Sequence, residues 1–161
     1  MSRLIKIVLA ILGSFAAGGG AHAEGGARPS GDNRMEYPTG DARLAEAMRK
    51  ARETLPRFLQ LADTGLRGAY LLKMRLAGGG RAEHIWVEVT GMRNGVFQGR
   101  LANDPVTPGY RAGDPVELSS DEIEDWMINT GEARFGGYTV RAMLGDMPAA
   151  QAEELRRQFR D

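Results

Sequence analysis

The feature that most limits what this chain can fold into is its N-terminus, because this segment decides which residues reach the folded protein. Two basic residues precede an apolar run that ends at Ala17, and Ala21 and Ala23 place small residues near the end of the segment. This order is typical of a secretory signal peptide. A membrane-spanning helix needs about 20 apolar residues, more than this run supplies. The sequence therefore predicts a signal peptide over 1–23, cleaved after Ala23, with no stable membrane anchor left.

The remaining chain has the length of a single domain. Residues 24–40 are rich in glycine, proline and small polar residues and predict a flexible lead. Residues 41–161 then form one domain. The chain has no cysteine, which excludes disulfides, thiolate metal sites and thiol catalysis. We expect a periplasmic or secreted protein that depends on its hydrophobic core.

Charge and residue types exclude several classes of partner. The 21 basic residues are balanced by 21 acidic ones, whereas proteins that bind nucleic acids or membrane surfaces carry a basic excess or patch. One histidine, His84, remains after processing, so a zinc site would need mostly carboxylate ligands. The acidic cluster at 121–125 lacks the glycine of a calcium loop and suits the first turn of a helix. We predict no nucleic-acid partner, no metal and no cofactor.

The spacing of apolar residues predicts helices in the first part of the domain and strands in the part that follows. A helical period begins at Asp41, a suitable N-cap, and Pro56 ends or kinks the helix and opens a second short one. From Gly68 the period changes to two, which predicts a strand followed by a hairpin turn at Gly78–Gly80. Two more strands are predicted over 83–92 and 96–102.

The turn between those two strands sets which side chains face the core. A two-residue Asn94-Gly95 loop would mix apolar and charged residues on both faces, whereas a three-residue loop pairs Met92 with Val96. The second register places Ile85 and Val87 on one apolar face, and burial favours it. The opposite face then carries a mixed set that we expect to point outward: His84, Trp86, Glu88 and Arg100, with Glu88 directly across from Arg100.

The rest of the chain completes an α+β fold. Val116–Leu118 predicts a short strand, Ser119 and Glu122 have the spacing of a helical capping box, 138–144 alternates as a last strand, and Pro148 opens a terminal helix. The predicted architecture is an N-terminal helix (or two) packed on a curved, mainly antiparallel sheet of about five strands. A short helix precedes the last strand and a C-terminal helix follows it.

An ordered set of segments resembles the YegJ-like family, known as domain of unknown function 2314 (DUF2314). The resemblance covers a core over about 41–145 and rests on these stretches: 51–58, 83–87, 113–116 with 123–127, and 136–141. It implies a bacterial protein, often exported. It implies no activity, so no functional residue is transferred from the family.

His84 is the candidate catalytic residue. As a general base it needs a group that orients it, and Glu88 on the same strand face is the nearest by spacing. Glu83, Asp114 and Asp125 are the other carboxylates that a catalytic site would bring to it. The opposing interpretation places His84 on an outer face and pairs Glu88 with Arg100.

Trp86 and Arg141 are candidate binding residues, together with Arg100. A tryptophan on an outward face is usually covered, either by the protein's own helix or lead segment or by a partner. Arg141 would either join a buried pair with Asp114 or Asp125, or bind the carboxylate of a ligand.

Taken together, these residues favour a non-catalytic exported module that binds a protein or envelope component through the face carrying His84, Trp86 and Arg100. The alternative is a small periplasmic hydrolase that uses His84 with a nearby carboxylate.

Overall fold

The computed structural model describes residues 4–8, 34–38 and 40–161. Its elements, in chain order, are β1 (Leu4–Val8), β2 (Arg34–Pro38), α1 (Ala42–Glu53), α2 (Leu55–Asp63), β3 (Ala69–Gly78), β4 (Arg81–Arg93), β5 (Val96–Leu101), β6 (Pro115–Leu118), the 3₁₀ turn η1 (Ser120–Glu122), β7 (Ile123–Asn129), β8 (Arg134–Gly136), α3 (Tyr138–Met143), the 3₁₀ turn η2 (Leu144–Asp146), α4 (Ala149–Gln158) and β9 (Phe159–Arg160). The fold is α+β, as predicted. The predicted cleavage site lies outside the described residues, whereas β1 lies inside the predicted signal peptide.

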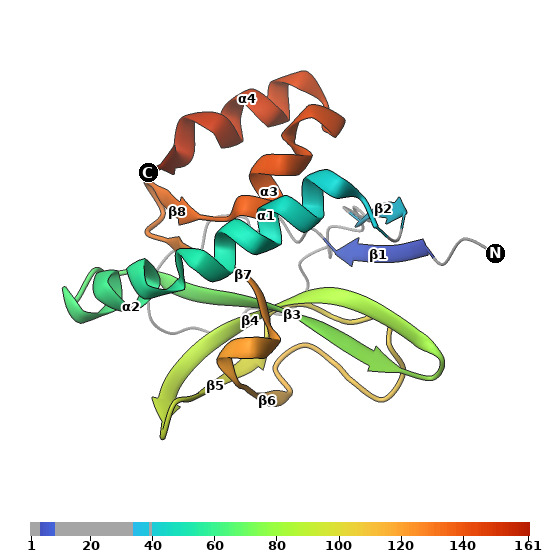
Figure 1. Cartoon of the computed structure of the whole chain (residues 1–161), viewed down its shortest axis with the longest axis horizontal. Coiled ribbons are helices and arrows are strands. Elements are labelled where there is room, and N and C mark those ends of the chain that lie inside the picture. Colours follow the sequence, from blue (N-terminus) through green and yellow to red (C-terminus); the bar gives the residue numbers. More distant parts are fainter. Residues whose placement is uncertain (1–3, 9–33, 39) are drawn as a thin grey trace, which may run out of the picture.

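All described strands belong to one mixed sheet. Its main path runs β2-β1-β4-β3-β7-β8-β9, and β5 and β6 extend it from β4. The pairs β1–β4 and β8–β9 are parallel and the other pairs are antiparallel. The sheet is mainly antiparallel, as predicted, and its strands β3 and β4 curve along their length (Figure 1). Within residues 4–8, 34–38 and 40–161 the sheet has nine strands rather than about five.

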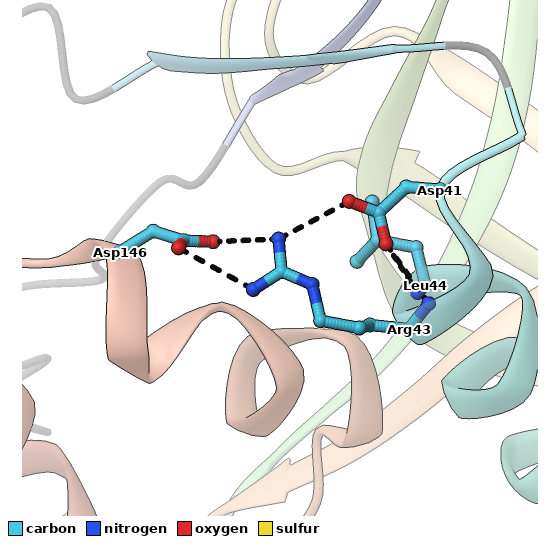
Figure 2. A network of polar contacts seen from close by, with 4 residues as sticks. All are labelled: Asp41, Arg43, Leu44 and Asp146. Atoms are coloured by element: carbon cyan, nitrogen blue, oxygen red, sulfur yellow. Dashed lines mark hydrogen bonds and ion pairs between the residues drawn. The ribbon is translucent and has the colours of Figure 1, made fainter.

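The first two helices follow the predicted signals. Asp41 caps α1, and its carboxylate accepts the backbone N–H groups of Arg43 and Leu44. Pro56 lies in the first turn of α2, where its missing N–H costs nothing. The Arg43 guanidinium also contacts Asp41 and Asp146, and thereby ties the start of α1 to η2 (Figure 2). Figure 1 shows α1 beside α3, with α4 at the periphery.

The β4–β5 hairpin shows why the turn prediction was wrong and the register beyond it right. Asn94 and Gly95 have φ values of 51° and 78°, and Arg93 pairs with Val96 around a two-residue turn. The register then shifts between Val89 and Gly91. This irregularity acts as a bulge. Beyond it the predicted pairs are confirmed: Glu88 with Arg100, and Val87 with Leu101.

Two elements near the C-terminal end have the opposite type from the predicted one. The helix predicted after Ser119 is wrong: the capping box is present, but it closes only the short turn η1, and β7 follows. The last strand, predicted over 138–144, is also wrong, because these residues form α3 and the start of η2. Gly136 and Gly137 have positive φ values of 72° and 64° and turn the chain from β8 into α3.

The central strands are buried on both faces. Ile85 and Val87 lie with Leu72, Trp126 and Ile128 in one core, which the end of α1 and α2 cover. The expectation that these two residues point inward is therefore confirmed. A second core lies on the opposite face and consists of residues from α1, the sheet, α3 and α4: Leu44, Leu71, Trp86, Met127, Val140, Met143, Leu144, Met147, Ala152 and Leu155. The expectation that His84 and Trp86 face solvent is wrong, because their residues are 3% and 1% exposed.

Two glycines of the β4–β5 hairpin allow a matched test of this packing. A Cβ at Gly99 would lie 2.5 Å from the Glu88 carbonyl oxygen and 2.5 Å from Val87 Cγ1, whereas a Cβ at Gly91 would meet nothing within 4 Å. We expect Gly99→Ala to lower the free energy of unfolding by about 1–3 kcal/mol through overpacking. Gly91→Ala should change it by less than about 1 kcal/mol. Urea unfolding of both variants measures the difference, and equal losses would contradict the register.

Candidate functional site

A row of three buried side chains crosses the central strands beneath α3. Lys73 of β3 is paired in register with Trp86 of β4 on one side and with Asp125 of β7 on the other. Its ammonium nitrogen lies 5.0 Å from the centre of the Trp86 ring and 3.0 Å from the hydroxyl oxygen of Thr139 in α3. The buried cation therefore has an aromatic face and a hydroxyl acceptor within reach.

Asp125 caps α3 from a different element. Its carboxylate accepts the backbone N–H of Tyr138 at 3.1 Å and of Thr139 at 2.8 Å, both in the first turn of that helix. It also accepts the Thr139 hydroxyl at 2.6 Å and its neighbour Trp126's N–H at 2.8 Å. Negative charge at a helix N-terminus satisfies free N–H groups and suits the macrodipole. Thr139 thus joins the carboxylate to the ammonium group of Lys73.

Burial shifts the pKa of both charged groups in this network. Loss of water around Lys73 lowers its pKa from 10.5 to about 8, although Asp125 and Glu124 act in the opposite direction. Burial raises the pKa of Asp125, against the charge of Lys73 and the hydrogen bonds from Thr139 and Trp126. Amines with lowered pKa values serve as nucleophiles in many enzymes. Here both side chains are completely buried, so the network binds α3 to the sheet rather than a substrate.

His84 contacts a carboxylate that the sequence did not single out. Its Nδ1 atom makes a short contact with a carboxylate oxygen of Glu124, which lies where the β3–β7 register shifts. Glu88, the predicted partner, is exposed on the same strand. Asp114 instead accepts the backbone N–H of Arg111, and Asp125 belongs to the Lys73 network. An oriented imidazole is thus present, and 15% of the Glu124 side chain reaches solvent.

A third polar group lies beside β4 near its start. Glu83 is completely buried, and one of its carboxylate oxygens accepts the backbone N–H of Thr107 at 2.7 Å. Its other oxygen has no partner among the described residues, nor has the hydroxyl of Thr107 or the side-chain amide of Asn103. Buried polar atoms in native proteins are nearly always satisfied. Glu83 therefore keeps one acceptor that no described residue uses.

Arg100 and Arg141, predicted as binding residues, lie apart. Arg100 is exposed, donates to the Gly113 carbonyl at 3.0 Å and borders an open groove of about 240 Å³ over β5 and β6. Arg141 binds a carboxylate, but that of Asp161 at 2.9 Å, rather than Asp114 or Asp125. It also donates to the Arg160 carbonyl and stacks at 4.8 Å from the Phe159 ring centre. Arg141 therefore holds β9 in place.

The structure thus separates the residues that we predicted to share one binding face. His84 and Trp86 are buried, Trp86 as part of the second core, whereas Arg100 is exposed. The sequence analysis missed Lys73, Thr139 and Glu124. Lys73 did carry a signal, because it alternates with strongly apolar residues on a strand that ends up buried on both faces. Among residues 40–161 no cluster of three or more histidine, aspartate or glutamate side chains has the arrangement of a metal site.

Thr139 offers a direct test of the network. Thr139→Val keeps the shape of the side chain but removes the hydroxyl that donates to Asp125 and accepts from Lys73. Two buried charged groups then lose a hydrogen bond, so we expect the free energy of unfolding to fall by about 2–4 kcal/mol. Thr139→Ser keeps the hydroxyl and should cost about 1 kcal/mol. Chemical denaturation measures both, and a loss in Thr139→Val no larger than that in Thr139→Ser would contradict the role of the hydroxyl.

The lowered pKa of Lys73 predicts a dependence of stability on pH. Below pH 8 the amine is charged in both the folded and the unfolded chain, so it does not make the free energy of unfolding depend on pH. Between about pH 8 and 10.5 the unfolded chain binds a proton that the folded chain does not, so stability rises with pH. Relative to Lys73→Met, which shares every other titrating group, the wild type should gain up to about 3 kcal/mol over this window. Parallel unfolding curves at pH 7.5 and 10 measure the gain, and a constant difference would contradict it.

Comparison with known proteins locates the chain among bacterial relatives. "Uncharacterized protein YegJ" of Escherichia coli (strain K12) is 29% identical over 114 residues, which cover 70% of this chain and 74% of the relative. A "putative ankyrin repeat protein" of Neisseria meningitidis serogroup B is 30% identical over 73 residues, which cover 45% of this chain and only 29% of that protein. No solved structure matches the chain.

The family model covers nearly all of the domain described above. It matches residues 41–160, from the cap of α1 to β9, and so extends the predicted core of 41–145 to include α4. Among the described residues no helix is long and apolar enough to cross a bilayer. The resemblance inferred from the sequence is confirmed, and the chain belongs to DUF2314, a family of uncharacterized proteins conserved in bacteria.

Proposed function

We propose that this protein is an exported, non-catalytic binding module of the bacterial cell envelope. The observation that carries the proposal is the burial of its reactive side chains. Lys73, His84 and Asp125 are each 3% exposed or less. A general base or nucleophile must come within hydrogen-bond reach of a substrate, and these groups instead contact the protein's own side chains. The N-terminal sequence supports the export part of the proposal.

The groove beside Arg100 is the surface that suits such a role. It is lined by side chains of β5 and β6 and includes Gln98, Arg100, Val116 and Glu117. The Gln98 amide donates to Glu117 at 3.1 Å. Arg100 is the cationic side chain among the residues that line the groove. A guanidinium has five N–H donors in a planar fork and recognises carboxylates and phosphates. The proposed ligand is therefore a polar or acidic group of an envelope component.

The other two predicted binding residues do not contribute to this surface. Trp86 belongs to the second hydrophobic core, and Arg141 is engaged by Asp161 and the Phe159 ring. The hydrolase alternative rests on the contact between His84 and Glu124, which orients the imidazole through Nδ1. It requires an opening through which a substrate reaches His84.

A photo-crosslinking experiment tests the groove. A photoreactive amino acid at Glu117 should give discrete adducts in cells, whereas the same group at the exposed Asp63 of α2 should not. Arg100→Ala should weaken the Glu117 adducts by about tenfold, because a lost charge-assisted hydrogen bond is worth about 1.5–3 kcal/mol. Arg75→Ala, at another exposed arginine, should leave the adducts unchanged.

Two results would count against the proposal. Adducts that are equally strong from Glu117 and Asp63 would show that the groove is not a specific surface. Turnover of an ester, phosphoester or peptide substrate by the purified protein, abolished by His84→Ala without a loss of stability, would favour the hydrolase.

A further inference from the structure

The two edges of β4 are paired differently near its start. One edge pairs with β3 from Arg81 to Glu88. On the other edge, β5 ends opposite Val87, and the backbone N–H of Ala102 then donates to the Trp86 carbonyl at 2.9 Å. Beyond that point β1 takes over in parallel, with Lys6 in register with Glu83 and Ile7 with His84. The edge at Glu83 and His84 is therefore covered by β1 and by no other described strand.

β1 lies within the segment that we predict to be removed on export. If residues 1–23 are cleaved, the edge of β4 at Glu83 and His84 loses its neighbour. An open strand edge presents unpaired N–H and C=O groups and is a template for pairing with another chain. Recognition of an extended peptide by strand addition uses this template for affinity and the neighbouring side chains for specificity.

The unpartnered polar atoms lie beside this same edge. The segment that follows β5 leaves this edge after the Ala102 N–H on the Trp86 carbonyl and reaches Thr107, whose N–H binds the Glu83 carboxylate. Asn103 and Thr107 belong to this segment, and with Glu83 they hold four of the five side-chain atoms that are buried without a partner among the described residues. Glu83 and Thr107 are 0% and 1% exposed. A buried carboxylate oxygen without a donor is costly, and the ligand that suits it best is a cation.

We propose that the processed protein binds an extended segment of a partner polypeptide along this edge of β4, with a lysine or arginine opposite Glu83. The inference rests on the export part of the proposed function. In the precursor β1 occupies this edge, with Lys6 in register with Glu83. Cleavage removes this internal occupant and so makes the edge available when the protein reaches its destination.

The charges in register at this edge favour a partner strand over β2 as the neighbour of β4 after cleavage. β2 lies on the far side of β1, and Lys6 is in register with Glu36 of β2 as well as with Glu83 of β4. If β2 moved sideways into the place of β1, Glu36 would face Glu83. Like charges directly opposite each other destabilise a strand pair. An incoming strand with a basic residue at this position avoids the repulsion and supplies the missing donor.

Peptide binding to the processed protein, isolated from the envelope fraction of cells, tests the inference. The probe is a fluorescent peptide with the sequence of residues 3–9, and its control carries the Lys6→Glu change. We expect the lysine peptide to bind at least about tenfold more tightly than the glutamate peptide. Hydrogen exchange should show protection of residues 82–86 when it binds. The uncleaved precursor should bind neither peptide, because β1 fills the site.

Two variants of β4 show whether Glu83 is the determinant. Glu83→Gln should weaken binding of the lysine peptide by about tenfold and remove most of the discrimination between the two peptides. Glu88→Gln, an exposed site on the same strand, should leave both unchanged. Thermal unfolding confirms that both variants are folded. If Glu83→Gln fails to fold, the difference between the lysine and the glutamate peptide on the wild-type protein decides the question.

The possible failures point to different errors. Equal binding of the two peptides overturns the inference. Full protection of residues 82–86 from hydrogen exchange in the free processed protein also overturns it. If that protection is lost when residues 34–38 are removed, β2 is the strand that occupies the edge. Protection that rises with protein concentration identifies a second copy and also overturns it. A cleaved protein that binds neither peptide refutes this edge site but leaves the groove at Arg100 standing. Recovery of the chain with Met1 intact from the envelope refutes cleavage and with it the inference.

Discussion

The carboxylate of Asp125 is the group on which the second half of the fold depends. It accepts two N–H groups at the start of α3 and the hydroxyl of Thr139, which in turn contacts the ammonium group of Lys73. A helix of six residues is too short to be stable alone. α3 therefore exists because a strand supplies its cap. Since Val140 and Met143 of α3 pack over Leu71 and Trp86, the same contact also closes the second core.

Burial of both faces of the central strands decides what the protein presents to its surroundings. A sheet with one face open would have exposed the imidazole of His84, the indole of Trp86 and the ammonium group of Lys73 to solvent. Here residues of α3 and α4 pack with the Trp86 indole, His84 contacts Glu124, and the cation of Lys73 is stabilised by the Trp86 ring and by Thr139. Buried ionic groups contribute little net stability compared with apolar packing, but removing one partner is costly. The network thus links β3, β4 and β7 to the start of α3.

Local signals in the sequence predicted local structure well. The cap at Asp41 and the proline at the start of α2 each depend on neighbouring residues, and each is found in the structure. The errors arise where residues distant in the sequence determine the local secondary structure. β7 was read as a helix because a strand buried on both faces has no alternation of apolar and polar residues. Residues 138–144 were read as a strand because their helix cap, Asp125, comes from another element.

The topology also bears on how the domain folds. β3 pairs with β7, which comes far later in the chain, and β9 joins β8 from the last residues of the domain. Chains dominated by such non-local pairings fold slowly, because the entropy of closing long loops is lost before the contacts form. The nascent chain therefore has no complete sheet until α4 and β9 have been synthesised. If the chain is exported unfolded, in line with the proposed function, this delay gives it time to reach the membrane before the sheet closes.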